Sequence, residues 1–235
     1  MLILKYLRLP FQFDANLLQE EVIQLLSRPW RQHYQKLHYE GEWSAIPLRS
    51  PGGNADDIFI AVREGMDYSD TEFLQDCPYL QSVLQVFKCP LKTVRLMKLN
   101  AGAVIKEHRD IDLSFEKGEI RLHIPIITHS EVEFFLEEER IPLHEGECWY
   151  LNFNLLHRVS NKSDIDRIHL VIDADVNDWV KDIFALEAID KKEIEYNSTS
   201  NYDADTKKFM ILRFREMNTE TSNRLADKLE KELDT

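Results

Sequence analysis

Residues 93–127 have the sequence TVRLMKLNAGAVIKEHRDIDLSFEKGEIRLHIPII. Three short runs rich in β-branched and aliphatic residues lie in this stretch, and they are separated by Asn100-Ala101-Gly102 and by Glu116-Lys117-Gly118. Both separating tripeptides are typical of turns. Short strands at this spacing favour a barrel or sandwich, so the stretch predicts the beginning of a mainly β domain.

The same pattern continues to about residue 175. Further short apolar runs are VEFFLE from 132, ECWYLNF from 147, HRVSN from 157 and IHLVIDA from 168. We therefore predict a cupin-like jelly-roll barrel over about residues 92–175, with helices from both flanks packed on its outside.

The chain before the barrel predicts two helices and a loop. Residues 14–28 have an Asp at the cap position and an amphipathic apolar pattern that ends at Pro29, and residues 78–88 repeat such a pattern after Pro78. Residues 43–57, WSAIPLRSPGGNADD, contain Pro and Gly at turn spacing and have no clear period. They predict a long loop.

The chain after the barrel becomes polar. Residues 178–188 predict a helix, residues 190–205 a polar linker, and the tail from about 206 a segment that ends in a highly charged helix. We expect residues 1–190 to form the jelly-roll domain with its N-terminal helices. Residues 191–235 would be a linker and a helical extension, which could pack on the same domain.

Composition excludes several classes of protein. The formal net charge of −13 argues against general binding of nucleic-acid phosphates, which uses dense Lys and Arg surfaces. The chain has no secretory signal pattern and no stretch near the roughly 20 apolar residues of a membrane span. Three widely spaced cysteines suggest neither a disulfide framework nor a zinc ribbon. We expect a cytoplasmic protein with no nucleic-acid or membrane partner, and its oligomeric state is left open.

A candidate metal site begins where one predicted strand ends. In Lys106-Glu107-His108-Arg109-Asp110, strand alternation places His108 and Asp110 on one side of the chain. His157 begins a later strand and could return beside them. Two histidines and one carboxylate leave three metal positions free, which suits Fe(II) with a bidentate 2-oxo acid and O₂. The alternative is a surface histidine and a solvated aspartate in a turn.

Arg167 strengthens the case for an oxo-acid site. It lies on the strand that follows His157, where a fixed guanidinium can bind the distal carboxylate of 2-oxoglutarate in bidentate fashion. The alternative is an exposed strand-end charge paired with Asp164 or Asp166. His169 shares its face with Arg167, and we assign it to the core or to the layer behind the site.

A second polar face lies on the strand IRLHIPI. Arg121 and His123 share one face of this strand, whereas aliphatic side chains share the other. A face with Arg and His is unusual in a barrel unless it lines a wet pocket, so both residues are pocket candidates. For His123 a hydrogen bond to a neighbouring backbone carbonyl is an equal alternative.

The order of six motifs resembles a known family. The motifs are W-x-x-I-P-L-R-S at 43, H-R-D at 108, R-L-H-I-P-I at 121, G-E-C-W-Y-L-N at 146, H-R-V-x-N at 157 and D-R-I-H-L at 166. They resemble the aspartyl/asparaginyl β-hydroxylase family, which includes bacterial proline hydroxylases and lipid A hydroxylases. The likeness covers about residues 40–180, and several ordered motifs are more specific than one H-x-D.

The resemblance implies a double-stranded β-helix that uses Fe(II), 2-oxoglutarate and O₂ to hydroxylate an unactivated C–H bond, with release of succinate and CO₂. It makes His108, Asp110 and His157 the catalytic iron ligands and Arg167 the 2-oxoglutarate anchor. Because the animal branch lacks the metal-binding carboxylate, Asp110 places the chain nearer the bacterial branch.

The resemblance extends less firmly to other pocket residues. Arg121 and His123 match positions that contact the co-substrate or a substrate carboxylate. Trp43 and Arg49 match the family's substrate-side loop only loosely, and we expect them to contact substrate; otherwise Trp43 is a packed side chain and Arg49 an exposed one.

The expected substrate is a small amino acid, or an Asp, Asn or Pro residue in a peptide. Two other functions stay open at this point. One is a jelly-roll metal-binding module without oxygenase activity, and the other is a cupin-type metalloenzyme that does not use 2-oxoglutarate.

Overall fold

The computed structural model describes residues 4–59, 66–185, 207–208, 211–212, 215 and 220–233. The chain divides into two compact units, Met1–Val176 and Asn177–Thr235. The strands described below all belong to the first unit. Our division of the chain at residue 190 stays a prediction.

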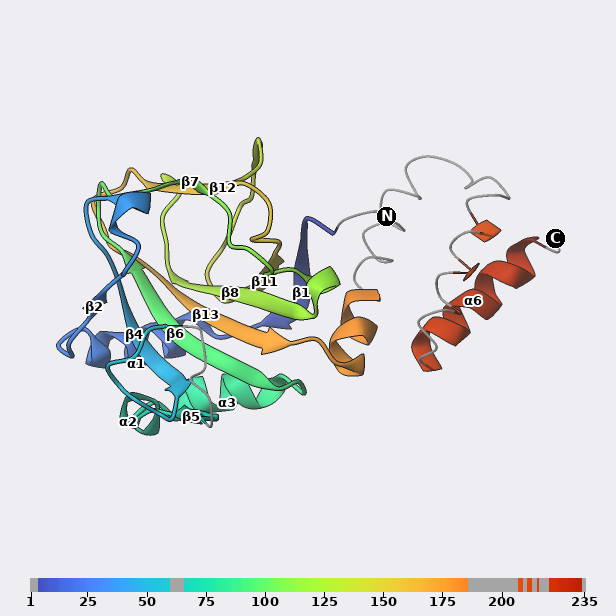
Figure 1. The fold of residues 1–235 in the computed structure, drawn as a ribbon, viewed down its shortest axis with the longest axis horizontal. Coiled ribbons are helices and arrows are strands. Elements are labelled where there is room, and N and C mark those ends of the chain that lie inside the picture. Colours follow the sequence, from blue (N-terminus) through green and yellow to red (C-terminus); the bar gives the residue numbers. More distant parts are fainter. Residues whose placement is uncertain are drawn as a thin grey trace. The chain divides into compact units, whose positions relative to one another are not determined.

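The strands of the first unit form two antiparallel sheets (Figure 1). The large sheet has, in spatial order, β1 (Tyr6–Gln12), β11 (Glu147–Leu151), β8 (Glu119–Ile127), β13 (Arg167–Asp175), β6 (Leu91–Leu99), β4 (Trp43–Pro51) and β2 (Arg31–Gln32), with β5 (Tyr68–Asp70) paired to β4. The small sheet has β10 (Glu139–Arg140), β9 (Val132–Leu136), β12 (His157–Asn161), β7 (Val104–His108) and β3 (Tyr39–Glu40).

From β6 to β13 the chain passes repeatedly between the two sheets. β6, β8, β11 and β13 belong to the large sheet, whereas β7, β9, β10 and β12 belong to the small one. This alternation is the jelly-roll arrangement, so the predicted mainly β jelly-roll fold is confirmed.

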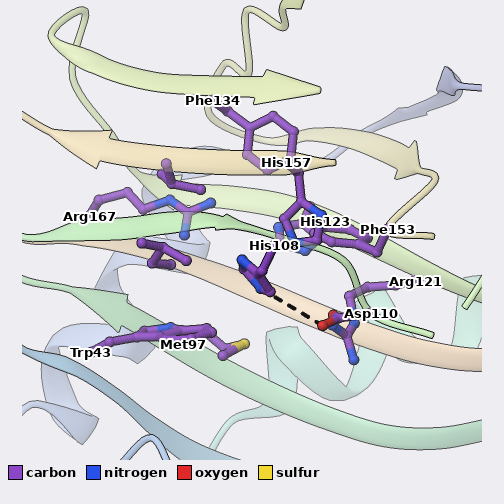
Figure 2. A pocket seen from close by; sticks show the side chains of 12 residues that line it. Trp43, Met97, His108, Asp110, Arg121, His123, Phe134, Phe153, His157 and Arg167 are labelled. Atoms are coloured by element: carbon purple, nitrogen blue, oxygen red, sulfur yellow. Dashed lines mark hydrogen bonds and ion pairs between the residues drawn. The ribbon is translucent and has the colours of Figure 1, made fainter. Parts of the chain in front are cut away.

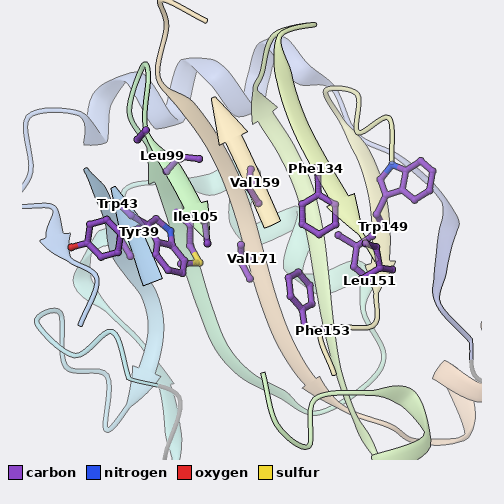
Figure 3. Close-up of a cluster of buried hydrophobic side chains, with 14 of the residues drawn as sticks. Tyr39, Trp43, Leu99, Ile105, Phe134, Trp149, Leu151, Phe153, Val159 and Val171 are labelled. Atoms are coloured by element: carbon purple, nitrogen blue, oxygen red, sulfur yellow. The ribbon is translucent and has the colours of Figure 1, made fainter. Parts of the chain in front are cut away.

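A hydrophobic core fills the space between the sheets (Figure 3). Leu99 and Val171 enter it from the large sheet and Ile105, Phe134 and Val159 from the small one. Leu99 and Val171 are completely buried, and full burial of such a side chain contributes about 1.5–3 kcal/mol. The core therefore fixes the two sheets face to face.

The prediction of a loop over residues 43–57 is wrong for its first nine residues. β4 (Trp43–Pro51) is an inner strand of the large sheet, where it pairs with β6 and β2. Its register against β6 shifts between Pro47 and Arg49, and proline is tolerated inside a sheet at such an irregularity. Pro47 is a turn signal in the sequence, and for this reason the strand was not predicted. The turn begins only with Gly52 and Gly53, which both have positive φ.

Three helices lie on the outer side of the large sheet (Figure 1), as the sequence predicts for two of them. α1 (Ala15–Leu25) is capped by the Asp14 carboxylate, which accepts from two backbone N–H groups. α3 (Pro78–Val86) begins at the expected proline, and Glu21 of α1 accepts from its first backbone N–H groups, those of Tyr79 and Leu80. α2 (Glu72–Gln75) packs beside α3 and β4.

In the second unit, residues 178–185 are helical, and α6 (Glu220–Leu233) confirms the predicted helix in the tail. The predicted linker at 190–205 lies outside the described residues. Among the helices that the structure describes, none has the length and apolarity to cross a bilayer. Cys77, Cys89 and Cys148 are free thiols.

Candidate metal centre and its pocket

Three side chains of the small sheet and its adjoining turn converge at one point (Figure 2). His157 opens β12 directly opposite His108, the last residue of β7. Asp110 follows two residues later, held by a backbone hydrogen bond from its N–H to the carbonyl of Phe153 at 2.9 Å. One nitrogen of each histidine and one oxygen of Asp110 all lie within 4.8 Å of one another. The structure thus brings together the three residues that we predicted as metal ligands.

Backbone contacts orient both imidazole rings. In His108, the ring atom Nδ1 lies 2.8 Å from the carbonyl oxygen of Lys106. In His157, Nδ1 lies 3.0 Å from the carbonyl oxygen of Leu155. A ring nitrogen that faces a carbonyl must donate, which leaves Nε2 of each neutral ring with a free lone pair. Burial, with a further contribution from His108, lowers the pKa of His157 to about 4, so this ring is neutral at pH 7.

A hydrogen bond from Arg121 holds the carboxylate of Asp110 in place. Arg121 donates from Nη1 to Asp110 Oδ2 at 2.7 Å, while Oδ1 lies 3.8 Å from His108 Nε2. Burial alone would raise the pKa of Asp110, but Arg121 and both histidines outweigh it and keep this pKa below its usual range. One bare carboxylate oxygen and two bare imidazole nitrogens fit a divalent first-row metal ion, and hydrogen bonds to their outer atoms are typical of such sites.

Arg121 also belongs to a buried network on the large sheet. Its Nε and Nη2 donate to the two carboxylate oxygens of Asp173 at 2.6 and 3.2 Å. Asp173 accepts as well from Arg95 Nη2 at 2.8 Å and from the Thr93 hydroxyl at 2.6 Å. Two guanidinium groups thus share one fully buried carboxylate, and Arg121 joins it to Asp110.

A pocket surrounds these groups. Its lining consists of the three candidate ligands, two arginines, one further histidine and a mostly apolar wall: Trp43, Met97, Ile105, His108, Asp110, Arg121, His123, Phe134, Phe153, His157, Val159 and Arg167. Half of these residues are polar and half are apolar, and polar groups that converge in a concave site with apolar walls are typical of small-molecule sites.

Arg167 is a buried pocket residue. Its side chain is 3% exposed, and Nη2 lies 2.8 Å from His169 Nδ1. Among the described residues it has no carboxylate within ion-pair distance, and the alternative partner Asp166 instead lies near Lys98. Burial lowers the pKa of Arg167 to about 9, which still leaves it charged at pH 7.

His123 lies beside this arginine. Its ring stacks on Phe153 with 5.0 Å between the ring centroids, and its Nδ1 lies 3.3 Å from His169 Nδ1. Its hydrogen-bond partner is thus a histidine and not the backbone carbonyl considered as an alternative. Burial and the charge of Arg167 hold the pKa of both histidines well below the usual range, so both rings are neutral.

The two predicted substrate contacts lie in different places. Trp43 lines the pocket and stacks on His33, with 3.6 Å between their ring centroids. Arg49 does not line it, because its guanidinium pairs with Asp70 at 2.5 Å and donates to the carbonyls of Leu91 and Tyr68. A substrate contact through Arg49 stays a prediction.

Sequence reasoning missed two charged residues of this region, Arg95 and Asp173. Each lies in an apolar run, VRLM and LVIDA, and each is almost fully buried. Charged side chains are seldom buried without a partner, so a charge inside such a run was the available signal.

Comparison with known proteins agrees with the motifs. Residues 12–176 match the family model described as Aspartyl/Asparaginyl beta-hydroxylase. The chain is 28% identical to an L-proline cis-4-hydroxylase of Rhizobium meliloti (strain 1021) over 135 residues, which cover 57% of this chain and 48% of that protein. It is 26% identical to L-proline cis-3-hydroxylase 1 of a Streptomyces species over 140 residues, which cover 57% of this chain and 47% of that protein.

The chain thus spans about half the length of these curated relatives. Among solved structures, a Pseudomonas putida prolyl-4-hydroxylase is similar with a TM-score of 0.45 and 12% identity, over 73% of this chain and 92% of that one.

Proposed function

Because the chain belongs to the aspartyl/asparaginyl β-hydroxylase family, we propose that it is an Fe(II)- and 2-oxoglutarate-dependent hydroxylase. One observation carries the proposal: a single pocket contains both a cluster of two histidines and one carboxylate, and a buried arginine without a carboxylate partner among the described residues. The first suits a metal with open positions, and the second suits an anionic ligand.

In this proposal His108, Asp110 and His157 hold the iron. Two histidines and one carboxylate would suit a metal that also binds a 2-oxo acid and O₂. Iron held in this way supplies the activation of O₂ that hydroxylation of an unactivated C–H bond requires. Arg121 keeps Asp110 ionised and fixes the orientation of its carboxylate, because it donates a hydrogen bond to Oδ2.

Arg167 binds the distal carboxylate of 2-oxoglutarate. A guanidinium matches a carboxylate in bidentate geometry, and the burial of Arg167 strengthens its attraction for an anion. His123 lies next to Arg167 and contacts the co-substrate. Arg121 is a second candidate for such a contact. The aromatic rings of Phe134 and Phe153 line the same pocket and exclude water from the reacting atoms.

We propose a free amino acid as the substrate, and an Asp, Asn or Pro residue in a peptide as the second possibility. The names of the relatives support an amino acid, since both are L-proline hydroxylases. Trp43 offers an apolar wall against which a substrate side chain or ring could pack.

The deciding experiment measures succinate formed from 2-oxoglutarate in the presence of Fe(II) and O₂, with a panel of free amino acids and of short peptides. We expect an amino acid to stimulate succinate release in the parent protein and not in Asp110→Ala. No turnover of 2-oxoglutarate with any substrate, together with tight metal binding, would favour the metal-binding module. Metal binding without any affinity for 2-oxoglutarate would favour the cupin-type metalloenzyme.

A further inference from the structure

The buried arginines around the pocket have partners of two kinds. Arg95 and Arg121 both form ion pairs with Asp173, and Arg121 pairs with Asp110 as well. Arg167 is equally buried, yet its hydrogen-bond partner is the uncharged ring of His169. The protein therefore neutralises two guanidinium groups and leaves the third with its full charge.

The contact between Arg167 and His169 determines which nitrogen of the His169 ring carries no proton. A guanidinium can only donate, so His169 Nδ1 accepts from Arg167 Nη2 at 2.8 Å and carries no proton itself. His123 Nδ1 lies 3.3 Å from the same atom, and it can only be a second, longer donor to the one lone pair of His169 Nδ1, which Arg167 already occupies. His169 itself is 1% exposed.

We propose that His169 is a positioning residue, which holds Arg167 in place without neutralising it and so keeps this arginine ready for the distal carboxylate of the co-substrate. Arg167 and His169 are two residues apart in β13 and therefore lie on the same face of the strand. The inference rests on the proposed function, because it takes 2-oxoglutarate as the anion.

A neutral acceptor suits this place better than a carboxylate. An Asp here would form a buried ion pair with Arg167 and would have to be displaced, or would repel the incoming carboxylate. An apolar residue would leave the guanidinium free to rotate away. The imidazole satisfies one donor of Arg167, and the Nε donor stays buried without a hydrogen-bond partner.

The test compares three variants that separate shape from charge. His169→Asn keeps a neutral acceptor near the position of Nδ1, His169→Asp has the same shape with a negative charge, and His169→Leu removes the acceptor. Calorimetry on the Mn(II)-loaded proteins without O₂ measures the affinity for 2-oxoglutarate. The control ligand is 2-oxobutyrate, which has the same 2-oxo acid group and no distal carboxylate.

We expect the affinity of the Asn variant for 2-oxoglutarate to be within about threefold of the parent affinity and that of the Leu variant to be about tenfold weaker. The Asp variant should bind 2-oxoglutarate at least about thirtyfold more weakly, because its carboxylate removes the charge complementarity between the site and the anion. The affinities for 2-oxobutyrate and for Mn(II) should be the same in all four proteins. The melting temperature of the Asp variant should equal or exceed that of the Asn variant, because Arg167 then gains a counter-ion.

Equal 2-oxoglutarate affinity in the Asp and Asn variants would overturn the charge argument. Parent-like affinity in the Leu variant would overturn the positioning role. If the Asp variant does not fold, the comparison of Asn with Leu still decides, since retention by Asn and loss by Leu supports the inference and equal binding refutes it. Absence of 2-oxoglutarate binding in the parent protein itself would instead refute the proposed function, and this inference with it.

Discussion

His157 lies directly opposite His108 across the pairing of β12 with β7, and the centroids of the two imidazole rings are 4.2 Å apart. The register of two strands thus brings together two of the three residues of the candidate metal centre. A slip by one residue would turn His157 to the other face of the small sheet, so the core residues that fix this register also fix the site. Val159 is one of them, since it pairs with Ile105 in the same ladder.

Replacing Asp110 by Ala should weaken Fe(II) or Mn(II) binding by at least about 100-fold, because loss of a direct ligand should cost no less than loss of a group that only supports one. Turnover should be abolished. Arg109→Ala is the matched control, because its side chain is exposed in the same turn. Calorimetry with Mn(II) provides the measurement, and unchanged affinity in the Asp110 variant would remove this residue from the ligand set.

Replacing Arg167 by Gln or Ala should leave metal binding intact and raise the KM for 2-oxoglutarate steeply. Removal of one partner from a desolvated charge pair costs about 2–5 kcal/mol, which corresponds to well over tenfold in affinity. Arg158→Gln, which removes a partly exposed arginine paired with Glu107, should change neither quantity. If the Arg167 variants bound 2-oxoglutarate like the parent, the anchor would have to be sought at Arg121.

Arg167→Met should also raise the melting temperature. Burial disfavours the charged form of Arg167, and the described residues offer it no carboxylate to compensate. A flexible apolar side chain of similar length removes this cost, and replacement of even a paired buried charge by apolar residues is often neutral or stabilising. A lower melting temperature would mean that Arg167 has a structural role.

Asp173 should make stability sensitive to acid. Burial alone would raise its pKa, but Arg121, Arg95 and hydrogen bonds outweigh it, so the pKa in the folded protein is below its usual range. Its stabilising contribution is therefore complete above the unfolded pKa of about 3.9, and it is lost as the pH falls through the lower, folded value.

Asp173→Asn should cost about 3–5 kcal/mol at pH 7, because Arg95 and Arg121 would lose their shared carboxylate. Below pH 4 the stability of the variant should fall less steeply than that of the parent. Asp70→Asn, which breaks an exposed pair with Arg49, should cost less than about 1 kcal/mol. Urea unfolding between pH 2 and pH 7 measures the free energy of unfolding of all three proteins. If this free energy fell equally steeply with pH in the parent and in Asp173→Asn, the assigned role of Asp173 would be contradicted.

Only part of the candidate metal cluster has local signals, because His157 reaches the other two residues through the pairing of β12 with β7. His108 and Asp110 are two residues apart at a strand end, so alternation alone places them on one side. Arg167 and His123 likewise lie in strands whose apolar pattern is clear. For these residues the sequence needed only the correct strand assignment.

The network behind the cluster depends on pairing between distant strands. Asp173 faces Arg121 because β13 pairs with β8, and Arg95 reaches Asp173 because β6 pairs with the other edge of β13. No local pattern contains that register. The strand β4 was missed for a different reason, since Pro47 is a strong turn signal that a register shift can accommodate.

Metal binding should stabilise the folded protein, which provides a test that needs no substrate. A ligand that binds only the folded state adds about 2.7 kcal/mol at a hundredfold excess over its Kd. We expect Mn(II) to raise the melting temperature of the parent protein and a chelator to reverse the effect. His157→Ala should abolish the shift, because this variant lacks one of the two nitrogen donors that β7 and β12 bring together. His129→Ala, which changes an exposed histidine on the same chain, should retain it. A shift of equal size in His157→Ala would show that the metal binds elsewhere, and the assignment of the cluster would then fail.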